Sequence, residues 1–227
     1  TPINAREWPV PLPNDCNLNL VRIEMLQHKA EYVWLDVLCL RQQGGEGEDL
    51  RGEEWKLDVP TIGFVYSGAP VVCYYSGLGR PLCLKPGYFD SDRCWFNRAW
   101  TLQEIVDGAI TGGDTGDTAM VDEEIQTEFN ERLKSLRETL HSHLNSVVGV
   151  ASQMQDRVST NPIDRIAGMA YLLDAKSLPA YYAKRSEEDA WVALVNAMSA
   201  QSRAELFIYY PEPGKGSKYW RPSWEEV

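Results

Sequence analysis

Residues 32–40 read YVWLDVLCL, a nearly continuous apolar run interrupted by a single acid, Asp36. A run this short and this apolar is typical of a strand that is buried on both faces of a parallel sheet. Residues 70–75, PVVCYY, repeat the pattern and predict a second buried strand. Ligands of parallel sheets bind at the carboxyl ends of the strands. We therefore expect a functional site in the loops after Leu40 and Tyr75.

Helical patterns flank these two strands. An apolar stripe that begins after Asn17 predicts one helix, and the spacing from Trp55 to Tyr66 predicts another, which Pro60 must start or kink. Residues 108–117 hold at most a short strand. The alternation of strands and helices up to about residue 112 predicts an α/β fold with a parallel, doubly wound sheet.

The C-terminal half has a different pattern. Apolar residues step by three or four from Phe129 to Met154, which predicts one long amphipathic helix. Further on we expect one capped helix that starts at Asn161–Asp164 and another that starts after Ser186. A final strand is expected at 205–210 and an aromatic tail at 219–224. The whole chain, 1–227, is expected to be a single domain. It divides into an extended leader (1–16), an α/β core (17–118) and a helical extension (119–227).

Composition excludes several classes of partner. The formal net charge is −11, from 33 acidic and 22 basic residues, so the chain should repel nucleic acid and anionic membranes. No apolar run approaches the ~18–20 residues that span a bilayer, and no signal peptide is visible, which favours the cytoplasm. The five cysteines lack a metal-binding spacing, and Cys39 and Cys73 lie in apolar runs, where we expect them buried.

The segment from Trp95 to Ile105 is the strongest candidate for chemistry. If it is a helix, steps of ~100° place Trp95, Ala99, Leu102 and Val106 on one apolar stripe, with Ile105 at its edge, that should face the sheet. The other side would carry Phe96, Asn97, Trp100, Gln103 and Glu104. Two aromatic rings beside an acid indicate either a pocket or a face covered by the long C-terminal helix, with Glu104 in a salt bridge or cap.

Five ordered blocks of the sequence resemble the fungal heterokaryon-incompatibility (HET) domain family. The resemblance rests on WLDVLCLRQ (34–42), IGFVYSGA (62–69, where Gly63 departs from the family pattern), WFNRAWTLQEI (95–105), NPIDRIAG (161–168) and RPSW (221–224). The family's opening strand, which resembles Y-x-A-L-S-Y-x-W-G, has no counterpart before Trp8, and the chain begins at Thr1 without a Met. The resemblance therefore implies a domain truncated at its N-terminus.

HET domains are thought to share a fold with TIR domains, whose active members cleave NAD with one glutamate. The resemblance thus implies a TIR-like (flavodoxin-like) sheet, NAD as a substrate without a bound cofactor, and Glu104 as the catalytic acid. A carboxylate at this place would stabilise the positive charge that develops on the ribose. The candidate NAD-binding residues are Asp36, Arg41, Arg98, Trp100 and Gln103. For two of them a structural role is as plausible, because Asp36 could cap a loop and Arg98 could pair with Asp36.

Two functions from different classes remain open. The first is an NAD-cleaving effector of non-self recognition and programmed cell death. The second is a non-enzymatic module that triggers the same response through self-association or a protein partner. Fold analogy alone does not decide between them.

Overall fold

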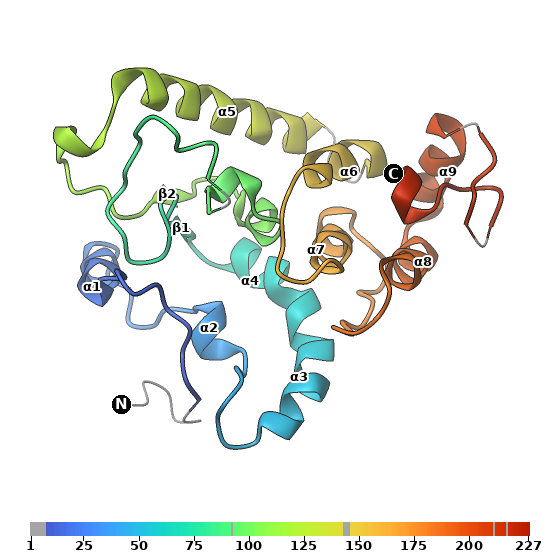
Figure 1. Ribbon diagram of the computed structural model, residues 1–227, viewed down its shortest axis with the longest axis horizontal. Coiled ribbons are helices and arrows are strands. Elements are labelled where there is room, and N and C mark those ends of the chain that lie inside the picture. Colours follow the sequence, from blue (N-terminus) through green and yellow to red (C-terminus); the bar gives the residue numbers. More distant parts are fainter. Residues whose placement is uncertain (1–7, 92, 143–145, 211, 217) are drawn as a thin grey trace.

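The computed structural model describes residues 8–91, 93–142, 146–210, 212–216 and 218–227, and these form a mostly helical protein (Figure 1). Within these ranges the strands are β1 (Val72–Cys73) and β2 (Ile110–Thr111), two residues each, in one two-stranded sheet. The prediction of an α/β fold with a parallel TIR-like (flavodoxin-like) sheet flanked by helices is therefore wrong. Of the expected leader, residues 1–7 lie outside the described residues.

Residues 32–40 account for most of this difference. They contain the short helix α2 (Asp36–Cys39) in place of a strand, and Tyr32 before it is 88% exposed. The Asp36 carboxylate accepts a hydrogen bond from the backbone N–H of Val37 at 2.8 Å, an interaction that favours an acid in the first turn of a helix. Cys39, expected to be buried, is exposed. A short apolar run does not distinguish a strand from a helical segment, because both leave the same pattern.

The other N-terminal helices are close to their expected positions. Asn17 caps α1 (Leu18–Gln27) by accepting from the Asn19 N–H. The pattern from Trp55 to Tyr66 forms α3 (Arg51–Asp58) and α4 (Ile62–Gly68). Between them, Val59–Thr61 form a 3₁₀ turn that contains Pro60, which has no N–H to donate to a helix. Another 3₁₀ turn, Glu48–Leu50, precedes α3.

The two strands run parallel, with Val72 opposite Ile110 and Cys73 opposite Thr111. The strand expected within 70–75 and the short one expected within 108–117 are both present. Cys73 and Tyr75 are 1% exposed and belong to the main hydrophobic core. The sheet thus fixes Cys73 beneath the segment that carries Glu104, and the Cys73 thiol approaches the backbone oxygen of Glu104 at 3.8 Å.

Five helices supply most of the C-terminal half: α5 (Glu123–Ser142), α6 (Val147–Gln155), α7 (Asp164–Leu172), α8 (Glu187–Ala197) and α9 (Ala200–Tyr209). The 3₁₀ turns Thr118–Met120 and Trp224–Glu226 lie before α5 and at the C-terminus. In Figure 1, α5 runs along one side of the molecule and α7 lies between α4 and α8. This central position makes α7 the helix against which both halves of the chain pack.

Three expectations for this half are changed. The long helix expected from Phe129 to Met154 is divided between α5 and α6, and residues 143–145 lie outside the described part of the chain. The helix expected from Asn161 begins at Asp164, while the Asn161 side-chain oxygen accepts from the Ile163 N–H at 3.4 Å and its NH2 group donates to Tyr181 and Ala183. The strand expected at 205–210 is the second half of α9, which Ser199 caps through the Ser202 N–H. Its aromatic and β-branched residues favour a strand locally, but the cap and the burial of Leu206 outweigh this preference.

Among the described residues, no helix has both the length and the apolar character needed to cross a membrane. The five cysteines are all free.

Candidate functional site

The segment from Trp95 to Ile105 is not one helix. It forms two 3₁₀ turns, Trp95–Asn97 and Trp100–Glu104, separated by Arg98 in an extended conformation. The Thr101 hydroxyl approaches the backbone oxygens of Trp95 and Arg98 at 2.6 and 2.7 Å. The break also pairs with the chain after α6, since the Ala99 N–H donates to the Val158 oxygen at 3.0 Å. Backbone groups released by the break are therefore bonded, as buried groups must be.

This break changes the direction in which the Glu104 side chain points. The expectation that Glu104 lies opposite Trp95 is wrong, because Oε2 of Glu104 accepts a 2.7 Å hydrogen bond from Nε1 of Trp95. The apolar residues of the expected stripe are nonetheless in the core: Trp95, Ala99 and Leu102 are 3%, 1% and 0% exposed. Glu104 itself is half-buried. Its carboxylate lies against the indole edge at the margin of the core.

The environment of Glu104 favours its protonated form. Burial raises the pKa of Glu104 to about 7 from an ordinary value of 4.5, and the negative charge of Asp36 adds to the rise. The hydrogen bond from Trp95 and the positive charges of Arg98 and Arg157 act in the opposite direction. Desolvation exceeds these favourable interactions, so the carboxyl group titrates near neutral pH.

Asp36, Tyr66, Arg98 and Glu104 form one electrostatic neighbourhood, which we call the Glu104 cluster. The pKa of Tyr66 is raised, first by burial and then by the charges of Glu104 and Asp36, while Arg98 lowers it. Burial and the Glu104 charge also raise the pKa of Cys73, to about 12, so the thiol stays protonated. Asp36 and Arg98 are exposed, so a ligand can reach their charges from solvent. The aromatic wall beside them is Trp34 against Tyr66, with ring centroids 5.8 Å apart.

The remaining three predicted site residues lie elsewhere. Arg41 is 7% exposed and forms a two-pronged ion pair with Glu54, at 2.8 and 2.9 Å, and donates to the Glu46 oxygen. Trp100 packs in a second, smaller hydrophobic cluster with Leu40 and Ile163. Gln103 is 2% exposed and donates to the Gly168 oxygen at 2.8 Å. These contacts give all three residues roles in packing, and the guanidinium of Arg41 is already occupied by a carboxylate.

Sequence reasoning did not single out two residues of this site. Tyr66 lies inside the motif block at residues 62–69, and that position could have identified it. Arg157 follows the end of α6 with no pattern around it, and it comes next to Trp95 and Glu104 only through the chain reversal after α6. Its position could not be read from local sequence.

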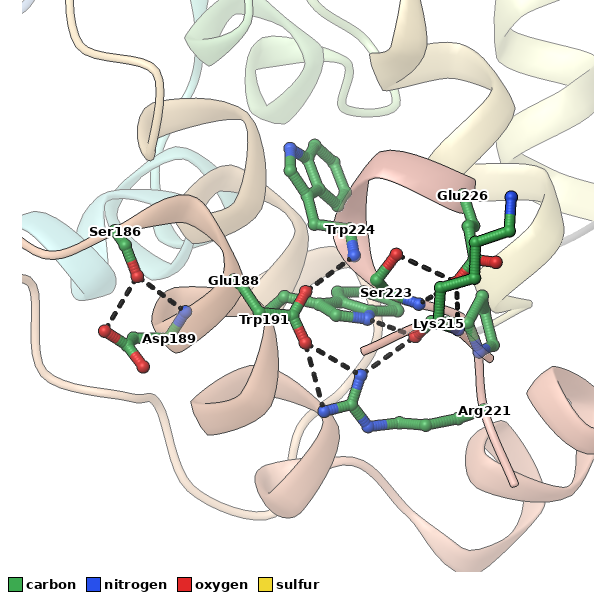
Figure 2. Close-up of polar contacts among 10 residues, drawn as sticks. Ser186, Glu188, Asp189, Trp191, Lys215, Arg221, Ser223, Trp224 and Glu226 are labelled. Atoms are coloured by element: carbon green, nitrogen blue, oxygen red, sulfur yellow. Dashed lines mark hydrogen bonds and ion pairs between the residues drawn. The ribbon is translucent and has the colours of Figure 1, made fainter. Parts of the chain in front are cut away.

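The last motif block, residues 221–224, fastens the C-terminal segment to α8 (Figure 2). Glu188 accepts from the Trp224 N–H at 2.8 Å and pairs with the buried Arg221 at 3.4 and 3.5 Å. The indole of Trp191 donates to the Pro222 oxygen at 3.0 Å, and Glu226 bonds both the N–H and the hydroxyl of Ser223. The contacts of this block are with α8, and they give it a structural role.

The described residues contain no group of three or more His, Cys, Asp or Glu side chains placed to hold a metal ion. Comparison with protein-family models, with curated proteins and with solved structures gives no significant match. The resemblance to HET domains therefore rests on the five motif blocks alone.

Proposed function

We propose that this chain is a HET-type domain of fungal non-self recognition and programmed cell death, acting in the cytoplasm, and that its Glu104 cluster cleaves NAD at the bond between nicotinamide and ribose. One observation carries the proposal. Three of the motif blocks, spread over residues 34–105, contribute Asp36, Tyr66, Arg98 and Glu104 to a single charged neighbourhood. The proposal does not use a TIR-like sheet, which the described residues do not form.

The chemistry of the cluster suits this reaction. Cleavage of an N-glycosidic bond builds positive charge on the ribose, and a poorly solvated carboxylate stabilises that charge more strongly than an exposed one. Water adds to the ribose carbon as nicotinamide leaves as a neutral group, so the site needs no strong acid. Arg98 is exposed beside Glu104 and offers a planar guanidinium to the pyrophosphate of NAD. Trp34 and Tyr66 offer aromatic surface for a ring.

Nicotinamide release from NAD by the full-length protein tests the proposal. We expect release that falls at least 100-fold in Glu104→Gln, and that rises in the wild type as the pH increases through about 7, because the carboxylate is the active form. Glu225→Gln, the same change at an exposed residue of the last turn, should leave the rate unchanged. Equal rates in Glu104→Gln and the wild type would reject Glu104 as the catalytic residue.

A non-enzymatic module is the second candidate, and an exposed apolar surface favours it. Phe207, Ile208 and Tyr209 of α9 are 64%, 67% and 64% exposed, which is unusual for three consecutive large side chains. Self-association through this surface would trigger cell death without chemistry. Gel filtration over a 100-fold range of concentration, combined with absence of NAD turnover in the concentrated fractions, would favour this function and reject the enzymatic one.

A further inference from the structure

An open groove lies between α5 and α6. Its volume is about 510 Å³, and Phe96, Ser135, Gln153, Asp156 and Arg157 are among the residues that line it. A space of this size falls within the range of roughly 300–1,000 Å³ that is typical of small-molecule sites. We call it the α5–α6 groove. Its walls combine one aromatic ring with hydroxyl, amide and charged groups.

Arg157 is the buried charge of this groove. The side chain is 5% exposed, whereas Asp156 beside it is exposed. Its Nε donates to the Gln153 backbone oxygen at 3.0 Å, and Nη1 donates to the Arg98 oxygen at 2.7 Å and to the Thr101 hydroxyl at 3.0 Å. These bonds fix the plane of the guanidinium. Within the described parts of the chain, Nη2 has no hydrogen-bond acceptor.

The bonds of Arg157 leave its charge without a carboxylate in contact. All three acceptors are neutral oxygens, and no salt bridge to Arg157 is found among the described residues. Burial lowers the pKa of Arg157 to about 10, with the more distant charge of Glu104 acting against this. At neutral pH the guanidinium is therefore charged, and Nη2, which is open to solvent, has no protein acceptor among the described residues. An anion at Nη2 would supply both the acceptor and a counter-charge.

We infer that the α5–α6 groove binds a small organic molecule through one anionic group, a carboxylate or a phosphate, which Nη2 of Arg157 recognises. The oxygen atoms of both groups match the planar donors of a fixed guanidinium. Glu131 and Asp156 also line the groove and repel a second negative charge, so the ligand carries a single anionic group with an uncharged body. Phe96 and Ser135 provide surface for that body. Anion binding in the groove does not require the proposed NAD reaction, although the charge of Arg157 also acts on Glu104.

Calorimetric titration of the folded chain with inorganic phosphate and with acetate, at constant ionic strength set by chloride, tests the inference. We expect saturable binding of at least one of the two anions, and the stronger binder identifies the class of the ligand. Two isosteric changes on α6 provide a matched pair. Gln153→Glu places a carboxylate in the groove beside Arg157, and Gln155→Glu places the same charge on the same helix outside the residues that line the groove.

We expect Gln153→Glu to weaken anion binding at least tenfold and Gln155→Glu to change it less than twofold. Arg157→Lys keeps the positive charge but removes the planar guanidinium, and it should weaken anion binding several-fold. Circular dichroism of each variant verifies that the helices are retained. Absence of saturable binding by the wild type, or equal weakening by Gln153→Glu and Gln155→Glu, would overturn the inference, because the effect would then be one of general charge.

Discussion

At neutral pH about half of the Glu104 side chains hold a proton, because burial raises their pKa to about 7. An unfolded chain, with a glutamate pKa near 4.5, has already released that proton. Between these two values the folded state binds more protons than the unfolded one, so its stability falls as the pH rises. The favourable contribution of this group is complete below about pH 4.5 and is lost by about pH 7.

Glu104→Gln should remove this dependence, because the amide resembles the protonated carboxyl and can still accept from Trp95. We expect the variant to gain stability relative to the wild type between pH 4.5 and 8, by up to about 3 kcal/mol at ~1.4 kcal/mol per pKa unit. Urea unfolding at several pH values measures the difference. The same experiment with Glu225→Gln, at an exposed acid, should give a difference that does not change with pH. A constant difference for both variants would contradict a raised pKa at Glu104.

The motif blocks selected Glu104 as the candidate acid, but they did not predict what surrounds its side chain. The motif blocks selected Asp36, Arg98 and Glu104, and the structure brings these three together. The helical wheel assigned Glu104 to the wrong side, because it assumed one continuous helix where Arg98 is extended. Arg157 could not be predicted, since it reaches the site through contacts 56 and 59 residues apart in sequence.

At the scale of elements, the packing of α4 on α7 depends on Gly63. A Cβ atom at Gly63 would lie 2.3 Å from two ring atoms of Tyr171 on α7, too close for any side chain. The Tyr171 ring also packs edge-on against Phe64, with centroids 4.9 Å apart. The departure of Gly63 from the HET pattern therefore has a physical reason, which is the close approach of these two helices.

Gly63→Ala should destabilise the protein by about 1–3 kcal/mol, because Tyr171 must move out of its place. The matched control is Gly52→Ala in α3, where nothing lies within 4 Å, and which should stabilise the helix by about 0.5–1 kcal/mol. Adding Tyr171→Ala should abolish the penalty of Gly63→Ala in a double-mutant cycle followed by urea unfolding. Two additive single effects would show that the contact is not the cause.

Helices could be predicted from the sequence where a capping residue or a proline marks their boundary. Asn17, Pro60 and Ser186 each mark a helix boundary or break that the structure contains. Residues 32–40 were predicted as a strand because a short, continuous apolar run is typical of one, and 205–210 because aromatic and β-branched residues favour strands locally. Asp36–Cys39 and the residues up to Tyr209 are helical instead, and the described strands β1 and β2 pair only with each other, so neither segment has the partner that a strand needs for its backbone groups. Local sequence does not contain that information.

At the scale of the whole molecule, the C-terminal segment is held to α8 by contacts that involve buried charge. Arg221 is 2% exposed, and Glu188 is the carboxylate that pairs with it. The same carboxylate accepts from the Trp224 N–H (Figure 2). The ring centroids of Trp191 and Trp224 lie 5.6 Å apart. Gly214 allows this arrangement, because a Cβ there would lie 1.8 Å from the Arg221 oxygen. The segment is thus part of the folded core rather than a loose tail.

Glu188→Ala should therefore release the C-terminal segment. Its removal leaves the buried Arg221 without a counter-charge, and we expect a loss of about 2–4 kcal/mol in the free energy of unfolding. Trypsin should then cut at Lys215 or Lys218 well before the helical core, and tryptophan fluorescence should report the separation of Trp191 from Trp224. The control is Glu225→Ala, at an exposed acid of the C-terminal 3₁₀ turn. It should change stability by less than about 0.5 kcal/mol and leave the tryptic pattern as in the wild type. Early cleavage in both variants, or in neither, would show that Glu188 does not hold the segment in place.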